Sequence, residues 1–487
     1  MKGKARALVE TVAGKTLRVA VLGAKDAGKT TFIVSLLQQL RNCSPANLAK
    51  LDDWTPQVGK QLKPEKYFKQ FSLSAAIEKM KQGEWPDPTS DVSQYRVPII
   101  FHHQKRRPRR IELQILDIPG ERVADFGMFE KNYDGWCDFM EEQAEGCQVL
   151  REYFQATENI FDQRTKPEND QSRGAAGETM AEKTGLDLDE KLRTEYRKCL
   201  HELKEEKSVF ISPSTALLDK KGNFHDNKDG ALGFDDVHQF VPLPKSVRTK
   251  ENRATVKRFA QAYKGYVDQI VTPVVKWLES ADKVVYLVDV LTLLNEGSAA
   301  YSTQKAMGNA ALNIFSRQAK TTFGRGWEWL FDSRADNIQL LATQADRVPT
   351  NQHGNMKKLL DQMHGQAVRS VEGAKYRIGI VTACSTTKEE PDKNKKTVKL
   401  RGMFVNDKNQ GNKEKNESLV SFVDKHGISD PTRTVPAFWP SETPGAARNW
   451  TSGDFQFDKT ILKPLMRDNS VPPQREIVQV IKALFDL

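Results

Sequence analysis

Gly23-Ala-Lys-Asp-Ala-Gly-Lys-Thr30 is the most informative stretch of the sequence, and it fits the pattern Gly-x4-Gly-Lys-[Ser/Thr]. The mostly apolar stretch at 16–22 predicts a buried strand before it, and the apolar face of 30–40 predicts a helix after it. In this context glycines let backbone N–H groups curl around phosphate oxygens, and the helix N-terminus adds partial positive charge. We therefore predict a phosphate-binding loop whose contacting residues are Gly23, Lys25, Asp26, Ala27, Gly28, Lys29, Thr30 and Thr31.

Two residues of this loop are expected to have further roles. Lys29 should bridge the β- and γ-phosphates of a nucleoside triphosphate, which makes it a candidate catalytic residue, and Thr30 should bind Mg²⁺. Thr89 precedes the next predicted strand and is a second candidate Mg²⁺ ligand; the alternative is a turn threonine after Pro88.

Asp117-Ile-Pro-Gly120 follows a predicted strand at 111–116. A strand that ends in aspartate can hold Mg²⁺ through a water molecule, and Gly120 can present its N–H to the γ-phosphate. The alternative is an Asx turn that ends the strand. Glu121 stands where many GTPases carry a water-positioning glutamine, so it is a candidate catalytic residue. Its carboxylate would also repel the γ-phosphate, which predicts slow turnover.

Thr343-Gln-Ala-Asp346 follows a predicted strand at 338–342, where GTPases place Asn-Lys-x-Asp. The Asp346 carboxylate could accept hydrogen bonds from N1–H and the amine of guanine, whereas adenine offers no matching donors; the alternative is a helix-capping aspartate. A second turn, Thr382-Ala-Cys-Ser385, follows the predicted strand that ends at Val381 and could offer backbone N–H groups to guanine O6. The predicted ligands are therefore GTP or GDP with Mg²⁺, and the predicted base contacts are Thr343, Gln344, Asp346, Ala383 and Cys384.

The order of predicted elements indicates an α/β fold. Strands alternate with helices in a way that is typical of a mostly parallel sheet with right-handed crossovers; they are expected at 95–101, 111–116, 283–289, 338–342 and 378–382. Between them, 127–281 is dominated by helical patterns, with a kink expected at Pro273 and a mobile polar loop at 168–190. We therefore predict a nucleotide-binding domain in two parts, 1–126 and 282–487, with a helical domain at 127–281 inserted between them. A loop excursion is expected at about 388–455, and a final helix at 475–487.

Composition narrows the class of protein. The 487 residues are 38% hydrophobic and 28% charged, which is typical of a globular protein of more than one domain. No apolar run of 18 residues is present, so a membrane span is not expected. The five cysteines show neither metal-ligand nor disulfide spacing, which favours a reducing, cytoplasmic location. The net charge of +10 could face nucleic acid, anionic lipid or an acidic protein, but a merely solvated basic surface is favoured over nucleic-acid binding.

The motifs in this order resemble those of the bacterial YcjX-like P-loop NTPases. The resemblance covers nearly the whole chain, and it extends from the glycine loop and Asp-x-Pro-Gly-Glu to Leu-Val-Asp-Val-Leu-x-x-Leu-Asn-x-Gly at 287–297, Ala-Thr-x-Ala-Asp-x-Val at 342–348, His353-Gly-Asn-Met356, Leu400-Arg-Gly402 and Phe455-Gln-Phe457. It implies a cytoplasmic nucleotide-binding protein tied to stress responses, described in some cases as an ATPase and in others as GTPase-like. Family members often carry lysine where this chain has Gln344.

Together these features predict a Ras-like P-loop NTPase core with a large helical insertion, and a switch in which GTP hydrolysis controls a surface for an unknown protein partner on that insertion. An ATP-binding protein and a nucleotide-bound scaffold with negligible turnover are the alternatives. Fold analogy by itself does not decide among the three.

Overall fold

A computed structural model describes the chain at residues 14–24, 26–42, 51–87, 91–129, 131–145, 147–165, 177–205, 213, 239–249, 252–298, 300–302, 304–309, 311–312, 338–369, 376–391, 398–402, 418–421, 434–442, 450–457 and 474–487. The chain divides into two compact units, of which the first combines Met1–Val123 with Trp277–Leu487 and the second is Ala124–Lys276. Within the part of the chain that the structure describes, none of the helices has the length and apolar character needed to cross a bilayer.

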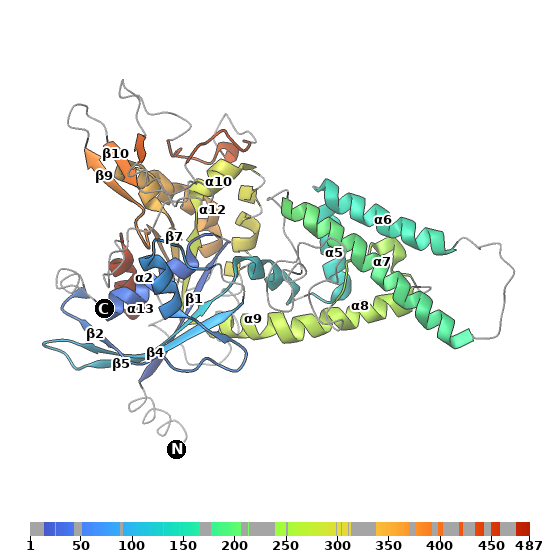
Figure 1. The fold of residues 1–487 in the computed structure, drawn as a ribbon, viewed down its shortest axis with the longest axis horizontal. Coiled ribbons are helices and arrows are strands. Elements are labelled where there is room, and N and C mark those ends of the chain that lie inside the picture. The colour runs from blue at the N-terminus through green and yellow to red at the C-terminus, as the bar shows by residue number, and fades with distance from the viewer. Residues whose placement is uncertain are drawn as a thin grey trace, which may run out of the picture. The chain divides into compact units, whose positions relative to one another are not determined.

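The first unit is built on an eight-stranded sheet with the order β2-β4-β5-β1-β6-β7-β8, in which β3 also pairs with β4 (Figure 1). Strands β5, β1, β6, β7 and β8 run parallel, while β2 and β5 each pair antiparallel with β4. A mostly parallel sheet of this kind is consistent with a Ras-like P-loop core, so the predicted fold class is confirmed. The strands are β1 Lys15–Gly23, β2 Thr55–Val58, β3 Lys69–Gln70, β4 Ser93–His102, β5 Arg109–Asp117, β6 Lys283–Val288, β7 Ile338–Ala342 and β8 Tyr376–Ile380.

Helices cover both faces of this sheet. On one face, α2 (Lys29–Arg41), α4 (Leu73–Lys81) and α13 (Ile477–Phe485) share an apolar core with alternate strand residues such as Val285 and Leu287. Because successive side chains of a strand point to opposite faces, Tyr286 lies on the other one. There its ring lies 5.2 Å from the ring of His364 in α12 (His353–Arg369), which packs on β7 and β8 beside α10 (Val290–Glu296).

The predicted final helix is confirmed as α13, which packs against α2 and places the ring of Phe485 4.8 Å from that of Phe101 in β4. Short 3-10 helices complete the first unit at Ala345–Arg347 (η7), Thr350–Gln352 (η8) and Pro440–Glu442 (η10). Another, Gly120–Met128 (η2), includes the point where the chain passes from the first unit to the second.

The expectation of a loop at about 388–455 is wrong for part of that region. Strands β9 (Thr387–Pro391), β10 (Val398–Gly402) and β11 (Ser418–Ser421) form a separate three-stranded antiparallel sheet in the order β11-β10-β9. In β10, apolar Val398 and Leu400 alternate with Lys399 and Arg401, which is the pattern of a half-buried strand. The high charge of the segment hides this alternation, yet Leu400 is fully buried.

The second unit is helical, with α5 (Tyr133–Ala144), α6 (Gln148–Thr165), α7 (Gly177–Glu205), the 3-10 helix η4 (Lys245–Val247) and α8 (Arg253–Tyr266) (Figure 1). The expectation of a mobile loop at 168–190 is wrong from Gly177 onward, because that part belongs to α7, and residues 168–176 lie outside the described part of the structure. The strong helix formers Glu178, Met180 and Ala181 outweigh the polar composition.

The helix that begins at Arg253 changes its hydrogen bonding close to Pro273. A π turn at Val267–Val271 (η5) separates α8 from α9 (Thr272–Glu279). Pro273 has no N–H, and its ring crowds the carbonyl group four residues earlier, so regular α-helical bonding must change here. The kink expected from the sequence thus coincides with an irregular turn just before the proline.

Candidate functional site

The candidate site lies at one edge of the sheet, where the parallel strands end. Strand register pairs Val21 with Asp117, Gly23 with Leu287, and Ala342 with both Val288 and Ile380. The loops that follow β5, β1, β6, β7 and β8 therefore start from the same edge. Open α/β sheets bind their ligands outside the carboxyl ends of their strands.

Two glycines shape the loop between β1 and α2. A Cβ atom at Gly23, whose φ is +150°, would lie 2.4 Å from the carbonyl oxygen of Leu287 in β6, so only glycine fits there. Gly28 has a φ of +81° and caps the N-terminus of α2 in the left-handed conformation. Asp26 is also left-handed and exposed, whereas Ala27 is buried.

Lys29 is buried at the first position of α2. Its Nζ donates hydrogen bonds to the carbonyl oxygens of Gly23, at 3.0 Å, and Ala24, at 2.6 Å. The ammonium group is thereby held inside the turn of the loop. Thr31, the third residue of α2, is half-buried, and Lys25 lies outside the described residues.

Thr30 and Asp117 bring two oxygen ligands together. The Thr30 hydroxyl donates to Asp117 Oδ2 at 3.3 Å, and Asp117, the last residue of β5, is 1% exposed. A hydroxyl and a carboxylate suit Mg²⁺, which usually completes its octahedral shell with water and phosphate oxygens. This pair therefore fits Mg²⁺, although the described residues hold no cluster of three or more His, Cys, Asp or Glu side chains suited to a metal.

The residues expected to sense the γ-phosphate follow β5 directly. Gly120 is buried and begins η2, whose first turn includes a hydrogen bond from Arg122 N to the carbonyl oxygen of Pro119 at 3.0 Å. Glu121 belongs to η2, but its side chain is outside the described part of the structure, and so is Thr89.

Asp346 connects the turns that follow β7 and β8. Its Oδ2 accepts hydrogen bonds from the backbone N–H of Thr386, at 2.6 Å, and from the Thr386 hydroxyl, at 2.7 Å. Asp346 is 4% exposed and lies within η7, whose N-terminal cap is Gln344. Its carboxylate is therefore oriented by the turn that follows β8.

The remaining predicted base contacts surround Asp346. Thr343 is buried and donates its N–H to the carbonyl oxygen of Val288 at 2.9 Å. After β8, Ala383 is half-buried and Cys384 is buried. His353 Nε2 lies 2.8 Å from the carbonyl oxygen of Ala345, and burial lowers the pKa of this histidine, so a neutral imidazole supports η7.

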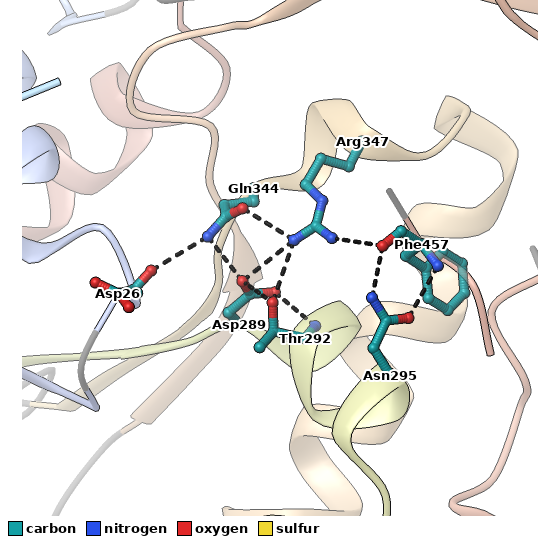
Figure 2. Close-up of polar contacts among 7 residues, drawn as sticks. All are labelled: Asp26, Asp289, Thr292, Asn295, Gln344, Arg347 and Phe457. Carbon is teal, nitrogen blue, oxygen red and sulfur yellow. Dashed lines mark hydrogen bonds and ion pairs between the residues drawn. The ribbon is translucent and has the colours of Figure 1, made fainter. Parts of the chain in front are cut away.

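The sequence did not single out three residues of this edge as site residues. The first two are Asp289 and Arg347. Asp289 directly follows β6, accepts a hydrogen bond from Gln344 Nε2 at 2.7 Å and forms an ion pair with Arg347 at 3.3 Å (Figure 2). Thr386, described above, is the third. An available signal for Asp289 was its place directly after a buried strand, which is also the place of Asp117.

The glycine loop between β1 and α2 and the Asp117 strand end, set in a mostly parallel sheet, define a protein with a Ras-like P-loop core. The chain belongs to the YcjX-like family, DUF463, whose sequence model matches residues 17–486. It is 24% identical over 497 residues to the Ras-like GTPase YcjX of Escherichia coli (strain K12), with 97% of this chain and 95% of the relative covered. It is 23% identical over 419 residues to the Ras-like GTPase YcjX of Shewanella oneidensis, with 79% of this chain and 80% of the relative covered.

Proposed function

We propose that this protein binds guanine nucleotides with Mg²⁺ and hydrolyses GTP slowly, as a regulatory switch. The observation that carries the proposal is the position of Asp346, whose buried carboxylate is oriented by Thr386 at the same sheet edge as Lys29 and Thr30. A carboxylate has acceptor capacity beyond the two bonds from Thr386, so it can also receive N–H donors from guanine. The names of both relatives agree with this choice of base.

Phosphate binding is assigned to the loop between β1 and α2. Gly28 has open space beside its backbone, since a Cβ atom there would meet none of the described residues within 4 Å. Backbone N–H groups can therefore approach phosphate oxygens closely, and the N-terminus of α2 adds favourable charge. In this proposal Lys29 leaves the carbonyl groups of Gly23 and Ala24 to contact the β- and γ-phosphates.

Magnesium and hydrolysis are assigned to the strand end at Asp117. Thr30 would bind Mg²⁺ directly, Asp117 would hold it through water, and the ion would neutralise charge that develops on the phosphates. Gly120 would donate its N–H to the γ-phosphate, and Glu121 would orient the attacking water. Loss of the Gly120 contact after hydrolysis would release η2, which leads into the second unit and a partner surface there.

The proposal is tested by identifying the nucleotide that copurifies with the protein and by measuring the affinities for GDP and ADP. GDP is expected to bind more tightly, and Asp346→Asn is expected to reduce the difference, because a site built on hydrogen bonds rejects the base that leaves them unmade. Asp361→Asn is a matched control, since Asp361 lies on α12 in an exposed ion pair with Arg369. Equal affinity for GDP and ADP would favour an ATPase, and nucleotide binding without turnover would favour a scaffold.

A further inference from the structure

Several motif residues have no part in the phosphate and base contacts proposed above. Asp289, Asn295 and Gly297 belong to Leu-Val-Asp-Val-Leu-x-x-Leu-Asn-x-Gly, and Phe457 ends Phe-Gln-Phe. In the structure Asp289, Asn295 and Phe457 meet beside the turn that holds Gln344 and Asp346. Figure 2 shows the side chains of Asp289 and Asn295 directed toward Arg347 and Phe457.

Asp289 is the centre of this arrangement. It caps α10 by accepting hydrogen bonds from the N–H of Thr292, at 3.0 Å, and from its hydroxyl, at 2.6 Å. Its Oδ2 also receives Gln344 Nε2 at 2.7 Å and the guanidinium of Arg347 at 3.3 Å. The side chains of Asp289 and Arg347 are each only 9% exposed, so solvent screens this ion pair weakly.

Gln344 is constrained at both ends of its amide. Its Oε1 accepts a hydrogen bond from Arg347 at 3.0 Å, while its Nε2 donates to Asp289 and, at 3.3 Å, to the carbonyl oxygen of Asp26 in the phosphate loop. A flipped amide would turn its oxygen toward the Asp289 carboxylate, so the orientation is determined. The backbone of Gln344 has a φ of +54°, a conformation that a non-glycine residue keeps only when its surroundings impose it.

A C-terminal segment, residues 450–457, is bound to the same network. Asn295 and Phe457 exchange two hydrogen bonds, from Phe457 N to Asn295 Oδ1 at 2.9 Å and from Asn295 Nδ2 to the Phe457 carbonyl oxygen. The same carbonyl oxygen accepts a hydrogen bond from Arg347 at 3.0 Å. At the other end of the segment, Trp450 Nε1 donates to the carbonyl oxygen of Leu294 at 3.0 Å.

We propose that Arg347 and Asn295 are positioning residues through which segment 450–457 sets the base specificity of the nucleotide site. Arg347 bonds to the segment, to Asp289 and to Gln344 at once, and the next residue back along the chain is Asp346. Loss of the Arg347 or Asn295 bonds would let the Gln344 turn relax from its left-handed conformation and move the Asp346 carboxylate. The inference rests on the proposed assignment of Asp346 to guanine.

The test compares GDP and ADP affinities of the full chain by titration calorimetry for wild type, Arg347→Gln and Asn295→Ala. Both variants are expected to bind GDP about tenfold more weakly, while their affinity for ADP changes by less than about twofold. Both nucleotides share the phosphate contacts, and only guanine requires Asp346. The GDP affinity of Arg347→Lys should fall between those of wild type and Arg347→Gln, since lysine keeps the charge and loses the planar guanidinium group. A purely structural loss would weaken both nucleotides equally and would refute the inference.

Arg258→Gln is the matched control. Arg258 pairs with the buried Asp189 in the second unit at 2.6 Å, so this variant also removes an arginine–aspartate pair but should leave the ratio of GDP to ADP affinity unchanged. If wild type prefers GDP and the two test variants keep the full preference, the positioning role is refuted while the proposed function stands. If wild type shows no preference for GDP, the proposed function fails and the inference fails with it.

Discussion

Replacing either glycine of the phosphate loop by alanine should separate folding from binding. At Gly23 the added Cβ would lie 2.4 Å from the Leu287 carbonyl oxygen, 3.2 Å from Leu287 Cβ and 3.3 Å from Ala27 Cβ. The nearest atom belongs to the backbone of β6, so relief requires β1 and β6 to separate. Overpacking of this kind costs roughly 1–3 kcal/mol, and the strained φ adds roughly 1–3 kcal/mol more. Gly23→Ala should therefore destabilise the protein by about 2–6 kcal/mol.

Gly28→Ala should behave differently, although Gly28 also has a positive φ. Its Cβ would meet no atom of the described residues within 4 Å, so only backbone strain of roughly 1–2 kcal/mol remains. That methyl group would instead project into the space assigned to phosphate oxygens. We expect Gly28→Ala to remain folded and to lose triphosphate binding.

Denaturant unfolding of the nucleotide-free protein, followed by tryptophan fluorescence, measures the first effect, and calorimetric titration with a slowly hydrolysed GTP analogue measures the second. Equal stability of the two variants would refute the close contact between Gly23 and β6. Unchanged affinity in Gly28→Ala would refute the assignment of the loop to phosphate.

Three further perturbations test the site and the core. Lys29→Ala should weaken binding of the triphosphate analogue by at least roughly 1–2 kcal/mol, because it removes charge-assisted hydrogen bonds. An unchanged affinity in calorimetry would refute the assignment of the loop to phosphate. Glu121→Gln should change the GTP hydrolysis rate by more than about twofold, and a smaller change would leave Glu121 a structural role. Burial, with a smaller contribution from Lys305, lowers the pKa of His364 to about 3, so this imidazole is neutral in the folded protein and protonates in the unfolded chain below about pH 6.5. The contribution of the neutral His364 to the free energy of unfolding is therefore complete above about pH 6.5 and is lost as the pH falls toward 3. Between pH 7.5 and 5.5 the loss is roughly 1.4 kcal/mol. Denaturant titrations should show this slope reduced in His364→Gln, and an equal slope in both proteins would contradict the neutral buried histidine.

The parts of the fold that the sequence predicts are those governed by local periodicity. The mostly apolar run at 338–342 matches β7 at both ends, and the apolar face of 30–40 matches α2 to within a residue at each end. Elements in polar segments were harder to predict from the sequence. The alternation in β10 is masked by lysine and arginine, and α7 begins in a stretch with few apolar residues, so its helix formers were outweighed by composition.

The phosphate loop and the Asp117 strand end were predictable as candidates because their chemistry depends on short patterns in a strand–loop context. The network around Arg347 was not, because its partners come from distant parts of the chain. Asp289 precedes Arg347 by 58 positions and Phe457 follows it by 110. Only the topology of the sheet, which sets β6 next to β7, brings the first pair together. The assignment of individual site residues to nucleotide contacts stays a prediction, as do the domain boundaries expected at 127 and 281 and the partner surface on the insertion.

The glutamine at position 344 is chemically matched to Arg347. A lysine at that position could donate to Asp289 and to the phosphate loop, but it has no acceptor for the hydrogen bond that Arg347 gives to Gln344 Oε1 at 3.0 Å. It would also place two cations beside one carboxylate, and one of them would remain imperfectly compensated in a region where solvent screens weakly. The amide satisfies Arg347 and Asp289 at once and still reaches the carbonyl oxygen of Asp26. Under the proposed function, glutamine at this position therefore connects the base turn to the phosphate loop, and the positive charge of the network lies on Arg347, where Asp289 neutralises it.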